Sequence, residues 1–372
     1  MAENQRYLAL DVFRGMTVCL MIIVNTPGDW GNVYGPLLHA PWHGFTPTDL
    51  VFPSFLFAVG NAMAFSLRRY QALGNDVFWK KTIKRTVIIF LIGFLLYWFP
   101  FIDFDTMSLK PLSETRIPGV LQRIALCFFI ASIVIHFGSR KFALWFSVAM
   151  LLLYWLILYV FGDPNDPYSL AGYAGNAVDL SLLGEKHLYH GEGVAFDPEG
   201  ILSTLPSVVN VIAGYLVGDL IRTKGNNFET IARLMMVGAV LILLALTWHM
   251  VFPINKKIWT SSFVLLTVGI DMFVLSLLIY VIEMRKKGQQ WTYFFLVFGR
   301  NPLFIYILSG LLIQIFYLIP AGNRNLQGWL YHDFFGSFTS AINASLLFAI
   351  FYTLLNWLVG YFLDKKKIYI RV

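Results

Sequence analysis

Long apolar runs separated by short polar breaks dominate the chain. A helix needs roughly 20 apolar residues to cross about 30 Å of hydrocarbon. Ten runs reach that length, at residues 8–26, 47–67, 82–100, 117–137, 141–161, 200–221, 230–251, 258–282, 291–319 and 339–363. We therefore predict an all-α fold, a polytopic membrane helix bundle of about ten transmembrane helices.

The ninth run is too long for one straight crossing and is interrupted by Gly299-Arg300-Asn301-Pro302. Proline lacks the backbone N–H that a continuing helix needs, and its ring clashes with the preceding turn. We therefore expect two half-helices over residues 291–319. Irregular backbone is tolerated inside a membrane where it lines a cavity, so this break is a candidate lining element.

The composition favours a membrane protein over a soluble one. The 372 residues are 58% hydrophobic and only 13% charged, whereas soluble domains are about a quarter charged. Cys19 and Cys127 lie within apolar runs, so we expect no disulfide. Asp11 and Arg14 interrupt the first apolar run, which therefore predicts a retained first span instead of a cleavable signal peptide. No separate soluble domain is expected, and residues 1–372 are predicted to form a single transmembrane domain.

Basic residues are divided unevenly between the two predicted faces. Assigning the loops alternately places 19 of the 28 Lys and Arg residues on one face and 6 on the other, and leaves Arg14, Arg123 and Arg300 inside spans. The positive-inside rule then predicts that both termini are cytoplasmic. The net charge of +7 is therefore a topology signal. Because the basic residues are dispersed over many loops and form no groove, nucleic acid is not an expected partner.

Charged residues inside the predicted spans need a partner or a use, since each costs at least about 2.5 kcal/mol in the bilayer core. Asp11 and Arg14 lie three residues apart on one helix face, so they either neutralise each other or bind a cytoplasmic ligand. Asp271 and Arg300 are expected to form an ion pair. Arg123 has no evident partner on its own helix and is the strongest functional candidate of the set.

A second group of polar residues gathers at the predicted outer ends of the spans, where it can converge on one outward-facing cavity: Asn25, His39, His43, Asp49, Asp197 and Glu199. Asp49 and Asp197 fit helix-capping carboxylates equally well. The spacing of the two histidines could suit zinc on a helix, but Pro41 and Gly44 argue against a helix there. We therefore predict no metal site. A histidine beside a carboxylate is instead suited to moving a proton.

Several motifs in order resemble one known family: Tyr7-Leu8-Ala9-Leu10-Asp11-Val12-Phe13-Arg14-Gly15, Ile23-Val24-Asn25, the stretch 39–53 with His39 and Asp49, Gly119-Val120-Leu121-Gln122-Arg123, Asp197-Pro198-Glu199-Gly200 and Gly299-Arg300-Asn301-Pro302. Together they resemble the heparan-alpha-glucosaminide N-acetyltransferase family and its bacterial relatives over nearly the whole chain. The resemblance implies a single transmembrane acyltransferase domain, multi-pass in a bacterial inner membrane. It also implies acetyl-CoA as cosubstrate on the cytoplasmic side and a glucosamine amine as acceptor on the periplasmic side.

The resemblance assigns roles to individual residues. His39 matches the family's catalytic histidine, and Asn25 matches an asparagine beside it. Lysosomal members typically carry asparagine where His43 stands, so the acceptor sugar stays open. The expected catalytic residues are His39, Asn25 and Asp49, the expected acetyl-CoA ligands are Arg14, Arg123, Arg300 and Asn301, and the expected acceptor ligands are Trp42, His43, Asp197 and Glu199.

Acyl transfer needs a proton acceptor, a donor to the oxyanion and positioning of both substrates. We expect His39 to accept the proton of the acceptor's amine or hydroxyl, with Asp49 as orienting carboxylate. Asn25, or alternatively Arg123, would donate to the carbonyl oxygen. An acetyl-histidine intermediate stays open. Arg14 and the basic run over 80–85 could hold the phosphates of CoA, although that run also fits a positive-inside flank.

A transporter of amino sugars such as N-acetylglucosamine is the alternative function. It is weakened by the lack of a second broken run at a matched position in the other half of the chain. The expected partners are a small-molecule sugar acceptor and the lipid bilayer, and a homodimer stays open.

Overall fold

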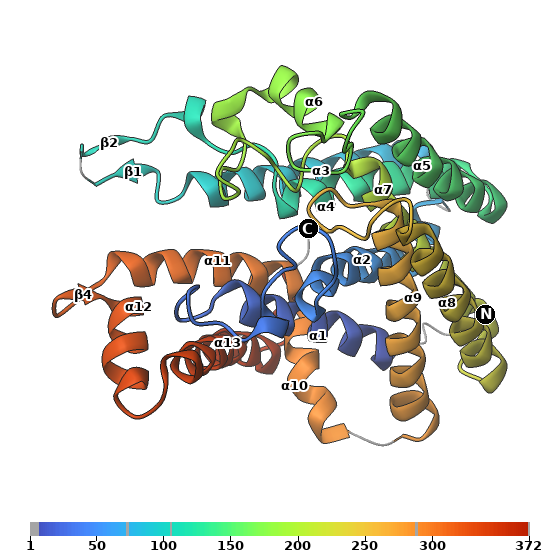
Figure 1. The fold of residues 1–372 in the computed structure, drawn as a ribbon. Helices are drawn as coiled ribbons and strands as arrows, with labels where there is room; N and C mark the ends of the chain where they lie inside the picture. Colours follow the sequence, from blue (N-terminus) through green and yellow to red (C-terminus); the bar gives the residue numbers. More distant parts are fainter. Residues whose placement is uncertain (1–6, 72–73, 105, 287–288, 371–372) are drawn as a thin grey trace. The chain divides into compact units, whose positions relative to one another are not determined.

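The computed structural model describes residues 7–71, 74–104, 106–286 and 289–370 (Figure 1). Within these ranges the chain is helical apart from loops and two short hairpins, which confirms the all-α fold. The chain divides into two compact units. The first contains the described parts of Met1–His39, Thr46–Phe55 and Leu277–Arg371, and the second contains Ala40–Phe45 and the described parts of Leu56–Ser276.

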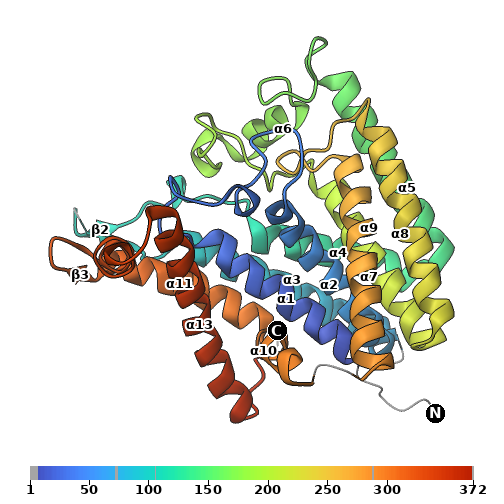
Figure 2. The same cartoon turned by 60° about the horizontal axis from the view of Figure 1, so that its bottom comes forward.

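The first unit is built around helix α1 (Leu8–Asn25), which packs against α10 (Gln289–Arg300), α11 (Pro302–Leu318) and α13 (Ala341–Lys365) (Figure 2). Glycine allows the closest of these contacts. A Cβ at Gly15 would lie 1.9 Å from the carbonyl oxygen of Phe295, and a Cβ at Gly299 would lie 2.2 Å from that of Asp11. The backbones of α1 and α10 therefore touch, as is typical of small-residue crossings in membranes.

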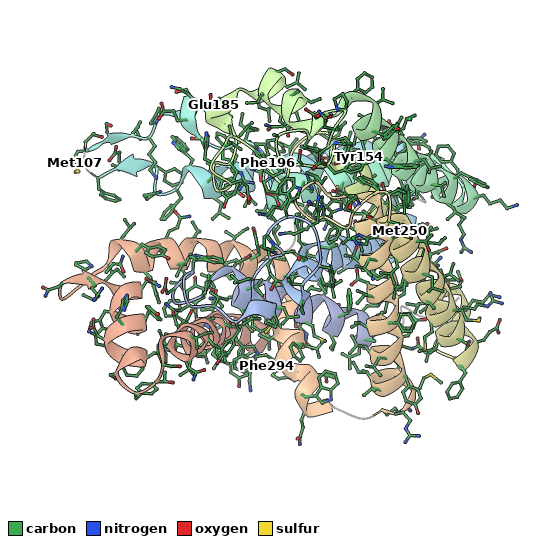
Figure 3. The ribbon with its side chains drawn as sticks, viewed as in Figure 1. Met107, Tyr154, Glu185, Phe196, Met250 and Phe294 are labelled. Atoms are coloured by element: carbon green, nitrogen blue, oxygen red, sulfur yellow. The ribbon has the colours of Figure 1, made fainter. Side chains whose placement is uncertain are left out.

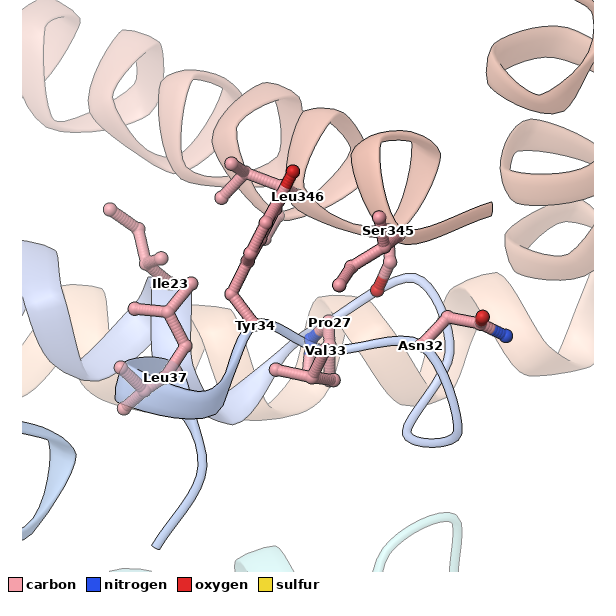
Figure 4. Close-up of a pocket in the computed structure, with 11 residues that line it drawn as sticks. Ile23, Pro27, Asn32, Val33, Tyr34, Leu37, Ser345 and Leu346 are labelled. Atoms are coloured by element: carbon pink, nitrogen blue, oxygen red, sulfur yellow. The ribbon is translucent and has the colours of Figure 1, made fainter. Parts of the chain in front are cut away.

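Shorter elements complete the first unit. They are η1 (Gly35–Leu37), the π-helix η4 (Ile279–Met284), the hairpin of β3 (Pro320–Ala321) and β4 (Arg324–Asn325), α12 (Leu326–Gly328), η5 (Trp329–Phe334) and η6 (Phe335–Ser337). A small, mainly apolar pocket lies where the loop after α1 meets the start of α13, lined by Ile23, Pro27, Tyr34, Leu37 and Leu346 among others (Figure 4). Its apolar walls hold the loop between α1 and α2 against α13.

The second unit contains the other long helices. They are α2 (Pro47–Gln71) from Leu56 onward, α3 (Asn75–Trp98), α4 (Val120–Phe137), α5 (Arg140–Phe161), α6 (Ala174–Leu183), α7 (Thr204–Lys224), α8 (Phe228–His249) and α9 (Ser261–Leu278) to Ser276. Its short elements are β1 (Ile102–Asp103), β2 (Ser108–Leu109), η2 (Leu112–Glu114) and η3 (Glu185–His187). A Cβ at Gly60 would lie 1.9 Å from the Val211 carbonyl oxygen, so α2 and α7 also cross through glycine. Buried aromatic side chains that include Tyr154 and Phe196 form a core under the loops (Figure 3).

Eight helices in the described ranges are long and apolar enough to cross a membrane, or nine if the bent pair α10 and α11 is one span. The prediction of ten spans is therefore not confirmed. The third expected span, 82–100, corresponds to α3, which starts at Asn75. This helix is not among the candidates, because Lys80, Lys81, Lys84 and Arg85 charge its first half.

The predicted break in the ninth run is confirmed. Helix α10 ends at Arg300, α11 begins at Pro302, and the two helices meet at an angle of 77°. Helix α7 begins at Thr204, where residue 200 was expected, and residues 162–199, between two predicted spans, contain the short helix α6. The orientation stays a prediction, and the terminal residues 1–6 and 371–372 lie outside the described residues.

Candidate functional site

His39 and Asp49 form a close pair in the first unit. The Nδ1 atom of His39 lies 2.7 Å from Oδ1 of Asp49. The His39 side chain is 37% exposed, whereas that of Asp49 is 1% exposed. A buried carboxylate that accepts from Nδ1–H fixes the neutral imidazole in the tautomer whose lone pair is on Nε2. The pair can therefore present a basic nitrogen to a molecule that reaches the loop.

Asp49 also caps the helix that follows. Thr46 directly precedes Pro47, the first residue of α2, and its backbone N–H donates to Oδ2 of Asp49 at 2.9 Å. The Thr46 hydroxyl donates to the Leu38 carbonyl oxygen at 2.6 Å, which fixes the residue before His39. The contact between the Thr46 N–H and Asp49 is one half of a capping box. Loss of a helix cap typically lowers stability by about 0.5–2 kcal/mol. The capping contact of Asp49 is therefore confirmed, and its other oxygen is left to contact His39, where its chemical role stays a prediction.

Asn25 is the last residue of α1, and its side chain is exposed. The helix ends there because the Thr26 hydroxyl binds the Ile22 carbonyl oxygen at 2.6 Å and the chain turns away. Asn25 belongs to the same unit as His39 and Asp49. Its amide can therefore serve as a hydrogen-bond donor at the protein surface.

Arg14 has protein partners on both sides. Its Nη2 donates to Asp11 Oδ1 at 2.7 Å, and its Nε donates to the Gly299 carbonyl oxygen at 2.8 Å. The mutual neutralisation of Asp11 and Arg14 is confirmed. Arg14 also satisfies a carbonyl that the break between α10 and α11 leaves without a helical donor.

Arg300 and Asn301, at the break itself, bind the C-terminal part of the unit. Arg300 Nη1 donates to Asp364 Oδ2 at 2.6 Å, so the carboxylate it pairs with is Asp364, where Asp271 was expected. Asn301 donates to the Ile368 carbonyl oxygen at 3.0 Å and accepts from the Ile370 N–H at 2.8 Å. The segment after α13 is thus hydrogen-bonded to the break between α10 and α11.

Asp197 and Glu199 are brought together in the second unit by Arg116. The guanidinium of Arg116 donates to Asp197 through Nε at 2.8 Å and through Nη2 at 2.6 Å, and Nη2 also donates to Glu199 Oε2 at 2.6 Å. Burial opposes ionisation of Glu199, but Arg116 and Arg123 outweigh it and hold the pKa of its carboxyl below the usual range. Because α7 starts at Thr204, the predicted capping role of Asp197 is wrong.

Arg123 is 1% exposed, near the start of α4. Its Nη2 donates to the Gly200 carbonyl oxygen at 2.9 Å and to the Ser203 hydroxyl, and the guanidinium lies 5.1 Å from the centre of the Trp259 ring. Its Nε and Nη1 atoms are buried without a hydrogen-bond partner in the described ranges. Buried donors of this kind are costly, so a further acceptor would stabilise the guanidinium.

Trp42 and His43 lie in the part of the loop between α1 and α2 that belongs to the second unit. Trp42 donates to the Tyr168 carbonyl oxygen at 2.8 Å and is largely a packing residue. His43 is exposed, and its Nδ1 lies 3.4 Å from Nδ2 of Asn255. Partial burial lowers the pKa of His43, against an opposing effect of Asp166.

Sequence reasoning missed several residues around these groups. Thr46 could have been found, because Thr46-Pro47-Thr48-Asp49 has the spacing of a capping box. Arg116 could not, because its partner Asp197 is 81 residues away. Asp179 accepts from the Ile201 N–H at 2.8 Å, and burial raises the pKa of its carboxyl to about 6. Across the described residues, no group of three or more His, Cys, Asp or Glu side chains is placed to hold a metal ion.

The predicted site residues fall in both units. The first unit contains His39, Asn25, Asp49, Arg14, Arg300 and Asn301, and the second contains Trp42, His43, Arg123, Asp197 and Glu199. Several helices are long and apolar enough to span a bilayer, and a histidine–carboxylate pair lies at the start of one of them. These features define the class of protein. The chain is a multi-pass, all-α membrane protein.

Comparison with known proteins gives the family. Residues 6–249 match the family model described as heparan-alpha-glucosaminide N-acetyltransferase, catalytic. The chain therefore belongs to the heparan-alpha-glucosaminide N-acetyltransferase family. It is 26% identical over 427 aligned residues to the Mus musculus protein heparan-alpha-glucosaminide N-acetyltransferase, which covers 100% of this chain and 61% of the relative. It is 29% identical over 361 residues to the Homo sapiens protein of that name, covering 81% of this chain and 52% of the relative. The chain thus spans between half and two thirds of the length of these relatives.

Proposed function

We propose that this protein is a transmembrane acetyltransferase that moves an acetyl group from acetyl-CoA on the cytoplasmic side to the amine of a glucosamine-type sugar on the periplasmic side of a bacterial inner membrane. The observation that carries the proposal is the contact of 2.7 Å between His39 and the buried Asp49. Membership of an acetyltransferase family and the multi-pass fold support it.

In the proposed reaction, Nε2 of His39 accepts the proton of the acceptor amine as its nitrogen attacks the thioester carbonyl carbon. A C–N bond forms and the C–S bond breaks. The sulfur of CoA leaves as a thiolate and takes the proton from the His39 imidazolium, so that the products are an N-acetyl sugar and CoA. Asp49 holds the ring through Nδ1 and stabilises its charged form, as general base catalysis requires.

The carbonyl oxygen becomes negatively charged during attack and needs a hydrogen-bond donor. Asn25, exposed in the same unit as His39, is the donor that we propose. For Arg123, in the second unit, we propose a contact with an oxygen of acetyl-CoA, because Nε and Nη1 lack partners in the described ranges. Arg14, Arg300 and Asn301 already bind protein atoms, so their proposed contact with acetyl-CoA rests on the family resemblance alone.

Among the proposed acceptor ligands, His43 is best supported by the structure. It is exposed, and its imidazole nitrogens can hydrogen-bond to a sugar hydroxyl. Trp42, Asp197 and Glu199 have protein partners, so for them a direct sugar contact is the weaker part of the proposal.

The proposal is tested by His39→Ala in liposomes that carry acetyl-CoA on one side and glucosamine on the other. Loss of a general base predicts a fall in transfer of labelled acetyl groups by about 10²–10⁴-fold, with acetyl-CoA binding retained. His190→Ala, a control in another loop, should transfer at the wild-type rate. Wild-type transfer by His39→Ala would refute the mechanism. Uptake of N-acetylglucosamine without acetyl-CoA and without transfer would favour a transporter instead.

Direct attack and an acetyl-histidine intermediate predict different species. Mass spectrometry of protein quenched after mixing with acetyl-CoA alone would find an added acetyl group on the peptide that contains His39 only in the two-step reaction. We propose direct transfer, so the peptide should stay unmodified.

A further inference from the structure

Helix α6, between α5 and α7 (Figure 1), carries a buried carboxylate that the proposed reaction does not use. Asp179 is 1% exposed, and its Oδ2 atom has no hydrogen-bond partner in the described ranges. Its Oδ1 atom accepts from the Ile201 backbone N–H at 2.8 Å. Burial of a carboxylate is costly, and this hydrogen bond offsets part of the cost.

Ile201 belongs to a turn, residues 200–203, that also binds Arg123. The Gly200 carbonyl oxygen accepts from Arg123 Nη2 at 2.9 Å, and the Ser203 hydroxyl accepts from the same nitrogen. The Ser203 hydroxyl in turn donates to the Gly200 carbonyl oxygen at 3.1 Å. Because a guanidinium group is planar and rigid, contacts that hold Nη2 also restrict the directions in which Nε–H and Nη1–H point.

Gly200 allows the Asp179 carboxylate to lie directly against this turn. A Cβ at Gly200 would lie 1.9 Å from Asp179 Oδ2 and 2.8 Å from its Cγ atom. The carboxylate therefore packs on the backbone whose carbonyl group binds Arg123. A methyl group at position 200 would occupy the space of the carboxylate and disturb its contact with Ile201.

The acceptor oxygen of Asp179 matters more to this turn than its negative charge. Burial raises the pKa of Asp179 to about 6, the nearby Asp197 adds to the rise, and the Ile201 N–H and Arg123 oppose it. The surroundings thus disfavour the charged form. A neutral side chain that keeps an acceptor oxygen should therefore still hold the Ile201 N–H.

We propose that Asp179 is a positioning residue for acetyl-CoA binding, which fixes the turn at residues 200–203 and thereby orients the free donors of Arg123 toward an oxygen of the cosubstrate. Those donors, Nε and Nη1, are buried without a partner in the described ranges. The inference rests on the proposed function, in which Arg123 contacts acetyl-CoA. It adds a residue of α6 that acts through Arg123 and touches neither substrate.

The test measures acetyl-CoA binding by calorimetry and acetyl transfer in liposomes, both with the full chain. Asp179→Ala removes the acceptor of the Ile201 N–H, so Kd and KM for acetyl-CoA should rise about tenfold, as for one charge-assisted hydrogen bond, with kcat nearly unchanged. Asp179→Asn keeps an acceptor oxygen, so its Kd should stay within about threefold of wild type. Asp163→Ala is the matched control, because Asp163 accepts from the Asn165 N–H at 2.8 Å but lies in an exposed loop.

A double-mutant cycle distinguishes positioning from a merely structural role. Arg123→Lys loses the planar guanidinium, so the addition of Asp179→Ala should change Kd for acetyl-CoA by less than about twofold. Equal effects of Asp179→Ala with and without Arg123→Lys would overturn the proposal. Gly200→Ala, which displaces the same carboxylate, is the second variant if Asp179→Ala folds poorly, and it should raise Kd in the same way.

The outcomes separate this inference from the proposed function. Unchanged Kd and KM for acetyl-CoA in both Asp179→Ala and Gly200→Ala would overturn the positioning role. If His39-dependent transfer to glucosamine persisted in that case, the proposed function would stand. Failure of the wild type to bind acetyl-CoA would overturn both.

Discussion

Asp49 uses its two carboxylate oxygens for different purposes. Oδ1 lies 2.7 Å from Nδ1 of His39, and Oδ2 accepts from the backbone of Thr46 at 2.9 Å. The second contact places the carboxylate at the start of α2 whether or not a substrate is bound. The carboxylate that we propose to orient His39 is thus held in place by the start of α2, which is the support that a functional group needs.

Asp49→Asn separates the two purposes. The amide oxygen can still accept from Thr46, but the NH₂ group then faces Nδ1 and favours the tautomer with its proton on Nε2. His39 can no longer accept a proton there, so kcat should fall by about 10²–10⁴-fold with little change in melting temperature. Steady-state transfer and thermal unfolding in detergent measure the two effects. Activity within twofold of wild type would remove Asp49 from the mechanism, and Asp163→Asn, at an exposed loop position, is the control.

At the scale of elements, the glycine crossing of α1 and α10 fixes the helix that leads to Asn25. Gly15 is the tightest point, because a Cβ there would lie 1.9 Å from the Phe295 carbonyl oxygen. That atom belongs to the backbone, so no side-chain rotation can make room for a methyl group.

Gly15→Ala should therefore lower the free energy of unfolding by about 1–3 kcal/mol, the usual cost of overpacking. Gly31→Ala is the control, since the nearest atom to its Cβ would be 3.6 Å away. Denaturant titration in detergent compares the two variants. Equal stability of Gly15→Ala and wild type would mean that α1 and α10 do not meet as described.

The elements also show what sequence can predict. Apolar length identified most spans, and Pro302 identified the break, because both signals are local. Helix α6 was missed because it is short and lies in a polar loop. The pairing of His39 with Asp49 could be predicted from ten residues of separation and the family motif. The partners of Arg300 and Asp197 could not, because only the fold brings Asp364 and Arg116 to them.

For the whole molecule, orientation decides from which side each substrate arrives. The excess of basic residues on one predicted face, 19 against 6, predicts that Lys224 lies inside and Lys186 outside. Native Cys19 and Cys127 are buried, so an introduced cysteine can be labelled selectively.

Lys186→Cys should react with a membrane-impermeant maleimide in intact cells, whereas Lys224→Cys should react only in inverted vesicles. Both side chains are exposed, which makes the two positions comparable. The measurement is the labelled fraction by mass spectrometry. The opposite pattern would reverse the predicted topology and with it the side from which acetyl-CoA is proposed to enter.

The link between Asn301 and the backbone of Ile368 and Ile370 has a consequence for biosynthesis. These partners follow Asn301 by 67 and 69 residues. During translation, α10 and α11 reach the bilayer before Ile368 and Ile370, which hydrogen-bond to Asn301 at their bend, have been synthesised. Closure of this part of the bundle is therefore a late event that waits until α13 has been translated and inserted.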